Sequence, residues 1–208
     1  MTKKIERRYE VEFRAEENEE HGYYVVGTPI VFDRETEIGG WYEEKIDRNA
    51  LTTTDMKDVR FLVNHNTDMI PLARSRNNNA NSTMQMWVEE DGLHIRVDLD
   101  VENNTEAASL YSAIKRGDVT GMSFMFTVDD DRWEDLDSDM PKRTILSISK
   151  IFEVSAVTFP AYEQTSIQAA GIDEALENAE TVLESARAKK HDEEVRSELK
   201  KMLKGEIK

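Results

Sequence analysis

The sequence of 208 residues has no cysteine, only four prolines and no stretch that approaches about 18 consecutive apolar residues. Without cysteine there can be no disulfide framework, thiolate zinc site, iron–sulfur cluster or cysteine nucleophile. The missing apolar run argues against a membrane-spanning helix, and the first ten residues, MTKKIERRYE, lack the apolar core of a secretory signal. We therefore expect a soluble, intracellular protein without a membrane partner.

Positive charge is also scarce, because 27 Lys and Arg face 43 Asp and Glu, which gives a formal net charge of −16. This acidic balance argues against a protein that grips phosphates, so no direct nucleic-acid partner is expected. Seven acidic residues lie in 129–139, DDDRWEDLDSD, which we interpret as a solvated loop. Two calcium-loop registers place Trp133 at the fifth position and Met140 at the sixth, so a calcium site is not expected.

The first 170 residues have mainly the pattern of β-strands. In 93–101 every second residue is apolar, which predicts one face in a core and the other in water. The strands predicted in this part of the chain are 9–13, 23–32, 60–63, 84–88, 93–101, 120–128, 144–149 and 151–159.

Helical patterns are few in the same part of the chain. One helix is predicted between a cap at Asn104 or Thr105 and an end at Gly117, and a shorter one near 47–51. Many strands with few flanking helices imply an α+β, mainly antiparallel β fold. We expect its sheet to close into a β-barrel, because closure removes exposed strand edges.

The pattern changes from Gly171 onward, where apolar residues at three- and four-residue steps predict an amphipathic helical tail. No proline- or glycine-rich linker marks the boundary. We divide the chain into a domain of 1–170 and a charged, helical tail of 171–208. Two interpretations of the tail are open: a helix packed on its own domain, and a partner-binding or removable segment.

Among the four histidines, His65 has the most distinctive surroundings. It follows the apolar run 61–63 where a strand ends, and Asn64 and Asn66 offer hydrogen bonds that can hold its ring. A histidine at a strand end can equally be a structural residue. The histidines in charged or polar surroundings are His21, His94 and His191.

Ser123 lies on a strand whose aromatic residues share the opposite face. A nucleophilic serine needs open access and a fixed backbone, and the small neighbour Gly121 leaves room for a substrate. The competing interpretation is a lone serine on the wet face of a strand.

Glu153 is the sole ionisable residue of the apolar run 151–160, IFEVSAVTFP. Such a carboxylate lies either on the wet side of a half-exposed strand or in a partly buried place with a partner, because burial without a partner is costly. A histidine that becomes imidazolium during acyl transfer is one natural partner, and a Lys or Arg is the rival.

Five segments together resemble the caudovirus prohead maturation proteases, HK97-type serine peptidases related in fold to the herpesvirus assembly protease. They are GWYEEKIDRNAL at 40–51, FLVNHN at 61–66, DGLHIRVDL at 91–99, GDVTGMSFMF at 117–126 and IFEVSAVTFPAY at 151–162. The family pattern has a His after a strand, a Ser in a Gly-x-Ser strand and an acid in a Glu-Val-Ser-x-Val-x-x-Pro-Ala strand. Matched residue by residue, these are His65, Ser123 and Glu153.

The resemblance implies a barrel of the herpesvirus-protease type and a serine endopeptidase with a Ser-His-Glu triad, without a cofactor or metal. The implied substrate is the scaffolding region of the major capsid protein or a separate scaffold, together with the protease itself. Other prohead components and self-association are further implied contacts. The implied location is the host cytoplasm, packaged inside the phage prohead, and self-cleavage would remove the tail.

The sequence departs from the family pattern at two places, Met125 where many relatives have Gly and Asn66 where many have Asp. Residues 154–166 contain no arginine of the kind that helps to build the oxyanion site in herpesvirus relatives, so the oxyanion donors stay unassigned. Two alternatives to an enzyme are open. One is an inactive protease fold that serves as a scaffolding or binding protein of the capsid, and the other is an acidic mimic of nucleic acid.

Overall fold

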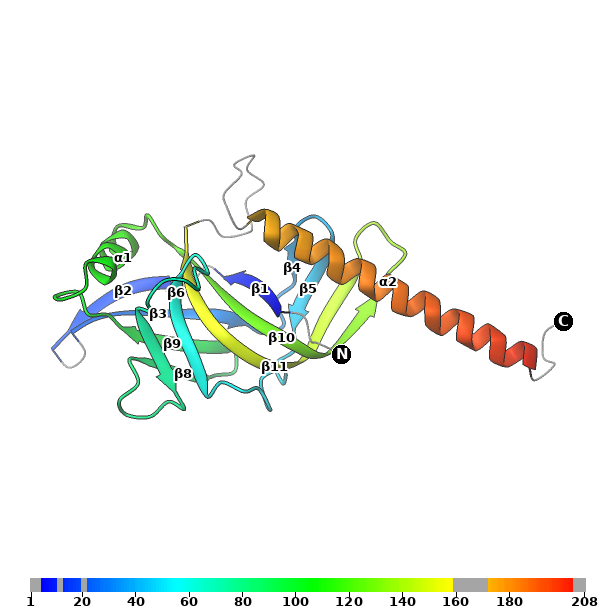
Figure 1. Ribbon diagram of the computed structural model, residues 1–208, viewed down its shortest axis with the longest axis horizontal. Coiled ribbons are helices and arrows are strands. Elements are labelled where there is room, and N and C mark those ends of the chain that lie inside the picture. Colours follow the sequence, from blue (N-terminus) through cyan, green and yellow to red (C-terminus); the bar gives the residue numbers. More distant parts are fainter. Residues whose placement is uncertain (1–4, 11–12, 20–21, 159–171, 204–208) are drawn as a thin grey trace.

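The computed structural model describes residues 5–10, 13–19, 22–158 and 172–203 and arranges their strands in two sheets (Figure 1). The larger sheet has the order β1 (Ile5–Glu10), β10 (Gly121–Glu134), β11 (Lys142–Val157), β5 (Tyr42–Ile46) and β4 (Thr36–Ile38), with β6 (Asp58–Val63) on β11 and β7 (Ala73–Arg76) on β6. The smaller sheet has the order β2 (Phe13–Asn18), β3 (Gly22–Val31), β9 (Gly92–Asp98) and β8 (Met84–Val88). The helices are α1 (Thr105–Arg116) and α2 (Ile172–Leu203).

The long strand β11 organises the larger sheet because it pairs with three other strands. β10 lies antiparallel along one edge of β11. On the other edge, β11 pairs in parallel with β5 through its first residues and with β6 through its last residues, where Glu153 lies opposite Arg60. Strands from three distant parts of the sequence, β6, β10 and β11, therefore lie side by side.

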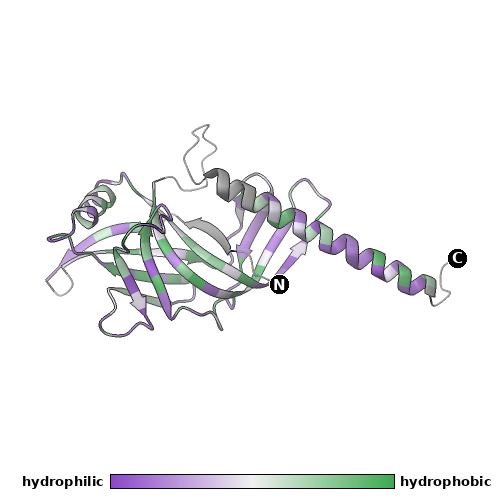
Figure 2. Cartoon of the chain, viewed as in Figure 1, coloured by the Kyte–Doolittle hydropathy of each residue, from purple (hydrophilic) through white to green (hydrophobic). Residues whose placement is uncertain are grey.

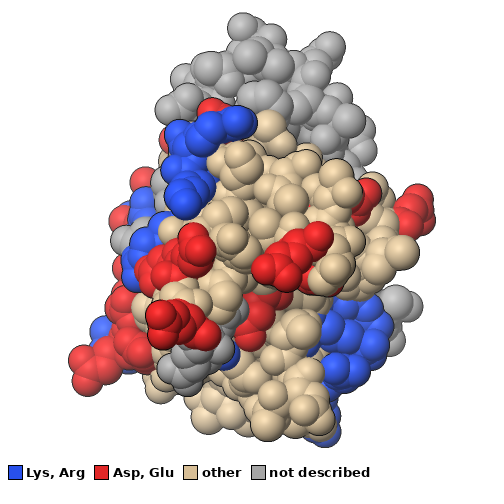
Figure 3. All heavy atoms as spheres, turned by 90° about the vertical axis from the view of Figure 1, so that its left-hand side faces the viewer, with Lys and Arg blue, Asp and Glu red and all other residues tan. Residues whose placement is uncertain are grey.

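The two sheets and α1 enclose the main hydrophobic core. Hydrophobic and hydrophilic residues follow one another along the strands (Figure 2). On β10, the rings of Phe124 and Phe126 stack in the core with centroids 4.7 Å apart, so Ser123 points to the opposite face, as the sequence predicts. On the side of the molecule seen in Figure 3, acidic and basic residues adjoin along one edge, and much of the remaining surface is uncharged.

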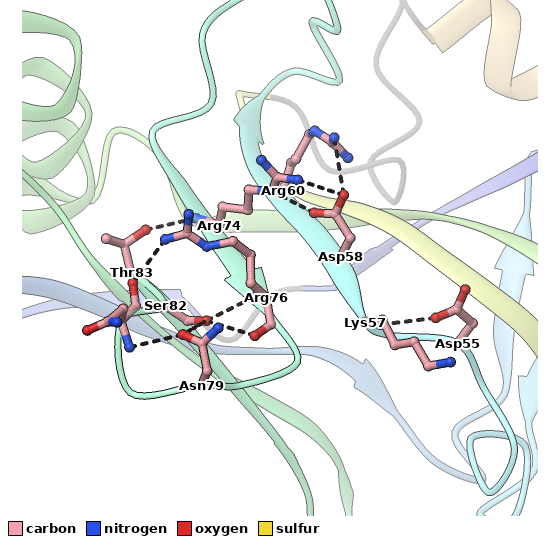
Figure 4. Close-up of polar contacts among 10 residues, drawn as sticks. Asp55, Lys57, Asp58, Arg60, Arg74, Arg76, Asn79, Ser82 and Thr83 are labelled. Atoms are coloured by element: carbon pink, nitrogen blue, oxygen red, sulfur yellow. Dashed lines mark hydrogen bonds and ion pairs between the residues drawn. The ribbon is translucent and has the colours of Figure 1, made fainter.

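The expected closed β-barrel is wrong, because both sheets are open. Among the described residues, no ladder joins β7 to β8 or β1 to the smaller sheet. At the edge of β7, hydroxyl groups replace a neighbouring strand: the Arg74 N–H donates to Thr83 Oγ1 (2.9 Å) and the Arg76 N–H donates to Ser82 Oγ (2.8 Å) (Figure 4). Because side chains already satisfy these backbone donors, the sheet has no need of a further strand there.

The helix after Asn104 is confirmed. Asn104 caps α1 by accepting the backbone N–H groups of Glu106 and Ala107, and Gly117 ends it in the left-handed conformation with a φ of 79°. The shorter helix near 47–51 is wrong. That segment forms successive turns, because Asp47 and its neighbours accept hydrogen bonds from residues only three positions ahead.

The acidic run 129–139 is not a loop throughout, because β10 continues to Glu134. Its charge is compensated there by a buried arginine. Arg143 Nε donates to Asp131 (2.8 Å), and Arg143 Nη1 donates to Glu44 (2.9 Å). These two ion pairs of Arg143 hold β5, β10 and β11 together at the end of the sheet near α2.

The tail forms a helix, α2, as predicted, but its apolar residues do not keep to one face over the full length of the helix. Ala179 and Leu183 pack against Tyr42, whereas the last turns project from the rest of the molecule and expose Leu199 (Figure 1). Part of the helix therefore packs on its own chain, and part of it has an open surface. The division between a domain of 1–170 and a tail stays a prediction. No helix within the described ranges is long and apolar enough to cross a membrane.

We expect Leu183→Ala to loosen the attachment of α2, because the Leu183 side chain is 3% exposed against Tyr42. The loss of buried surface and the resulting cavity should lower the free energy of opening of α2 by about 2–3 kcal/mol. Hydrogen exchange of the α2 amides measures this value. Leu199→Ala is the matched control, since Leu199 is 53% exposed and should change stability by less than about 0.5 kcal/mol.

Candidate active site

Three neighbouring strands place the predicted residues on one face of the larger sheet. Ser123 of β10 lies opposite Ser155 of β11, which lies opposite Leu62 of β6. Directly opposed residues of an antiparallel pair point to the same face, with Cβ atoms about 4.5–5.5 Å apart. Glu153 shares that face because it precedes Ser155 by two residues. The main core takes the alternate residues of these strands.

A tight turn after β6 brings His65 to the same face. Asn64 and His65 have φ angles of 51° and 55°, in the left-handed region that Asn and His adopt more readily than most residues. The Asn64 N–H donates to the carbonyl of Ala156 (2.9 Å), and Asn64 Oδ1 accepts the N–H of Thr158 (2.9 Å). The turn is therefore fastened to the last residues of β11.

His65 and Glu153 form a buried pair. His65 Nδ1 lies 2.5 Å from Glu153 Oε1, and the two side chains are 10% and 3% exposed. An ionised carboxylate only accepts hydrogen bonds, so Nδ1 donates and Nε2 of the neutral ring is left as the basic nitrogen. Of the two interpretations of Glu153, the structure supports burial with a partner, and this partner is a histidine.

Ser155 supplies the second hydrogen bond to the Glu153 carboxylate. Its Oγ donates to Glu153 Oε2 (2.5 Å) and accepts the backbone N–H of His65 (3.1 Å). Sequence patterns alone do not mark Ser155 as a functional residue. The available signal was its position two residues after Glu153, which places both on one face, but the contact with His65 depends on the turn after β6.

Ser123 is completely buried, and its Oγ makes no hydrogen bond within the described part of the chain. The interpretation of Ser123 as a serine on a wet face is therefore wrong. Buried hydroxyl groups rarely lack a partner, so this one requires an explanation. Ser123 lies directly across from Ser155, which contacts both His65 and Glu153.

Charged residues continue this face beyond the buried pair, toward β6 and β7 (Figure 4). Arg60 lies opposite Glu153 on β11 and opposite Arg74 on β7. Both arginines bind Asp58, Arg74 through two hydrogen bonds of 2.6 and 2.8 Å and Arg60 through one of 3.3 Å. The hydrogen bonds from Arg74 lower the pKa of Asp58 below its usual value. The carboxylate of Asp58 therefore stays ionised, and its negative charge offsets the positive charges of Arg60 and Arg74 next to the site.

A groove with a volume of about 510 Å³ lies between α1 and the residues that follow β6. Asn64 and Asn66, which flank His65 in the chain, line one side of it, and Leu110 of α1 lines the other. The groove is not lined by His65, Ser123 or Glu153. Its lining is mixed, with apolar side chains among polar ones, as in many ligand sites.

A second group of polar residues lies in the hairpin of β8 and β9, where ligand atoms of Glu89, Asp91 and His94 come within 4.8 Å of one another. Both ring nitrogens of His94 already have partners, Nε2 at 2.8 Å from Asp91 and Nδ1 at 3.2 Å from Thr28. These two contacts hold the His94 ring in place. His191 lies on α2, and His21 lies outside the described residues.

A histidine held by a carboxylate, with a serine on the neighbouring strand, is the residue set of the serine hydrolases. Residues 9–180 match the caudovirus prohead serine proteases. The chain belongs to this family, as the sequence motifs predict.

Proteins similar to this chain include a prohead protease and a capsid assembly protease. The prohead protease of Enterobacteria phage HK97 is 31% identical over 122 residues, which cover 59% of this chain and 48% of that protein. The chain therefore spans about half the length of this curated relative. Among solved structures, the bacteriophage T4 capsid assembly protease, gp21, matches with a TM-score of 0.40 and 13% identity, over 73% of this chain and 98% of that chain.

We expect Asn64→Ala to lower the free energy of unfolding by about 1–2 kcal/mol, because alanine loses the hydrogen bonds to Thr158 and tolerates a positive φ less well than asparagine. Asn64→Gly should be less destabilising, because glycine loses the same hydrogen bonds but adopts this φ without strain. Chemical denaturation of the three proteins measures both values. Equal losses in the two variants would show that the backbone conformation contributes nothing.

Proposed function

We propose that this protein is a serine endopeptidase of phage capsid maturation with Ser123 as nucleophile, His65 as general base and Glu153 as the residue that orients the histidine. One observation carries the proposal. The buried His65–Glu153 pair lies on the face where the buried Ser123 hydroxyl has no hydrogen-bond partner among the described residues. Membership of the prohead serine protease family agrees with this assignment.

The proposed reaction follows from the roles of the three groups. Ser123 Oγ attacks the carbonyl carbon of the scissile peptide bond while His65 Nε2 takes the hydroxyl proton. Glu153 stabilises the imidazolium that forms, because its Oε1 already accepts the Nδ1 proton. The imidazolium then gives its proton to the leaving amine, which leaves an acyl-enzyme on Ser123. Water attacks this acyl group while His65 takes a proton from the water, and His65 then returns a proton to Ser123 Oγ as the product leaves.

The substrate that suits this assignment is the scaffolding region of the major capsid protein, or a separate scaffold protein, inside an immature head. One observation supports it, the similarity of the chain to the prohead protease from phage HK97. The protease would act while packaged in the prohead, which assembles in the host cytoplasm, and would contact other prohead components or a second copy of itself. The segment 171–208 would be a docking or self-cleaved tail.

We expect Ser123→Ala to abolish cleavage and leave the fold intact, because only the buried, unbonded hydroxyl is lost. Intact-mass analysis of the chain, expressed together with its cognate major capsid protein, measures fragments of both proteins. Ser149→Ala is the matched control, since Ser149 also lies on the larger sheet but binds Thr127 (2.8 Å) away from the site. Identical fragments from wild type and Ser123→Ala would overturn the assignment.

We expect Glu153→Gln to slow the reaction of Ser123 with a serine-directed phosphonate by about 10²–10⁴-fold, because a neutral amide neither fixes the histidine tautomer nor stabilises the imidazolium. The melting temperature should change little in comparison, since the amide fills the same volume. Mass spectrometry of the labelled chain over time gives the rate. An inactive capsid scaffolding protein, the alternative function, would show no labelling of Ser123 in the wild type.

A further inference from the structure

Outside the proposed triad, Ser155 is the most deeply buried polar residue in the described part of the chain. Ser155 is completely buried, and its hydroxyl both donates and accepts a hydrogen bond. It donates to Glu153 Oε2 (2.5 Å) and accepts the backbone N–H of His65 (3.1 Å). One hydroxyl thus connects the acid of the proposed triad with the main chain of its histidine.

The contact with Glu153 determines how the carboxylate is oriented. Oε1 accepts from His65 Nδ1 and Oε2 accepts from Ser155, so the two oxygens have one donor each. Glu153 is only 3% exposed, which leaves little room for water to replace a lost donor. Without the Ser155 hydroxyl, Oε2 would be a buried anionic oxygen without a hydrogen bond, and the carboxylate would gain by rotating away from His65.

The contact with His65 acts on the backbone. His65 has a φ of 55°, a conformation that a non-glycine residue keeps only when its surroundings hold it. The Ser155 hydroxyl holds the N–H of that residue. Because the same oxygen binds the carboxylate, a shift of either partner changes the distance between His65 and Glu153.

We propose that Ser155 is a positioning residue of this protease, which keeps the proton on His65 Nδ1 and leaves Nε2 as the basic nitrogen that takes the proton of Ser123. The inference rests on the proposed function for its catalytic meaning. The effect of Ser155 on the His65 tautomer, exerted through Glu153, does not depend on any cleavage and can be measured without it. Ser155 itself does not touch the substrate in this scheme.

The experiment compares Ser155→Ala, which removes the hydroxyl, with Ser155→Thr, which keeps it. The first readout is the rate at which a fluorophosphonate labels Ser123 in the full chain. We expect Ser155→Ala to label about tenfold to a hundredfold more slowly than wild type, as part of the 10²–10⁴ that a general base contributes, and Ser155→Thr to recover most of the rate. Ser149→Ala, which removes a hydroxyl bound to Thr127, should label at the wild-type rate.

The second readout is the tautomer of His65, measured by ¹⁵N NMR of histidine-labelled protein in the Ser123→Ala background. We expect a protonated Nδ1 and an unprotonated Nε2 with Ser155 present and a mixture of tautomers in Ser155→Ala. Unchanged His65 resonances in a folded Ser155→Ala protein would overturn the proposal, as would labelling at the wild-type rate. If Ser155→Ala does not fold, Ser155→Cys replaces it, because a thiol fills the site and donates only weakly.

The two proposals fail in different ways. If the phosphonate does not label Ser123 in the wild type, the function is wrong, and the NMR comparison still decides whether Ser155 controls the tautomer. If Ser123 is labelled and Ser155→Ala changes neither the rate nor the tautomer, the function stands and the role of Ser155 is wrong. Equal slowing in Ser155→Ala and Ser155→Thr, with a native tautomer in both, would indicate packing alone and would also overturn the role.

Discussion

The register of β11 between β10 and β6 is the constraint on which the site depends. In this register Ser123 faces Ser155, and the turn after β6 places His65 over Glu153. A slip of one residue would turn Glu153 into the hydrophobic core and move a core residue into the site. The register is therefore fixed by the cost of burying a charge among apolar side chains, as well as by the hydrogen bonds of the ladder.

A buried carboxylate is tolerated here because the fold supplies two donors for it. One is a side chain delivered by a turn, His65, and the other is a hydroxyl from the same strand, Ser155. The turn depends on left-handed φ angles at Asn64 and His65, which are held by the attachment of Asn64 to the end of β11 and by the hydrogen bond from the His65 N–H to Ser155. The turn thus brings a donor to the buried carboxylate, and the carboxylate in return holds the histidine of the turn.

The sequence predicts those features that depend on local patterns. Alternation along 120–128 and 93–101 gives the correct faces of β10 and β9, and the cap and stop signals of α1 give its bounds. It does not predict how strands meet at the sheet edges. The hydroxyls of Ser82 and Thr83 occupy the edge of β7 and leave the sheet open, and this substitution of side chain for backbone has no periodic signature. The role of Ser155 was hidden for a related reason, since its second partner, the His65 N–H, lies 90 positions away in the chain.

The two ends of the β10–β11 pair carry two separate charge networks. At one end Arg143 joins Glu44 and Asp131, and at the other Glu153 joins His65. Bulges between the two ends shift the register and so turn the two halves of the pair toward different partners, α2 in one half and the turn after β6 in the other. Because the register shifts lie between the two halves, each network fixes the register of its own half of the pair. The ion pairs of Arg143 fix it at the end near α2, and the contact between His65 and Glu153 fixes it at the end that carries the site.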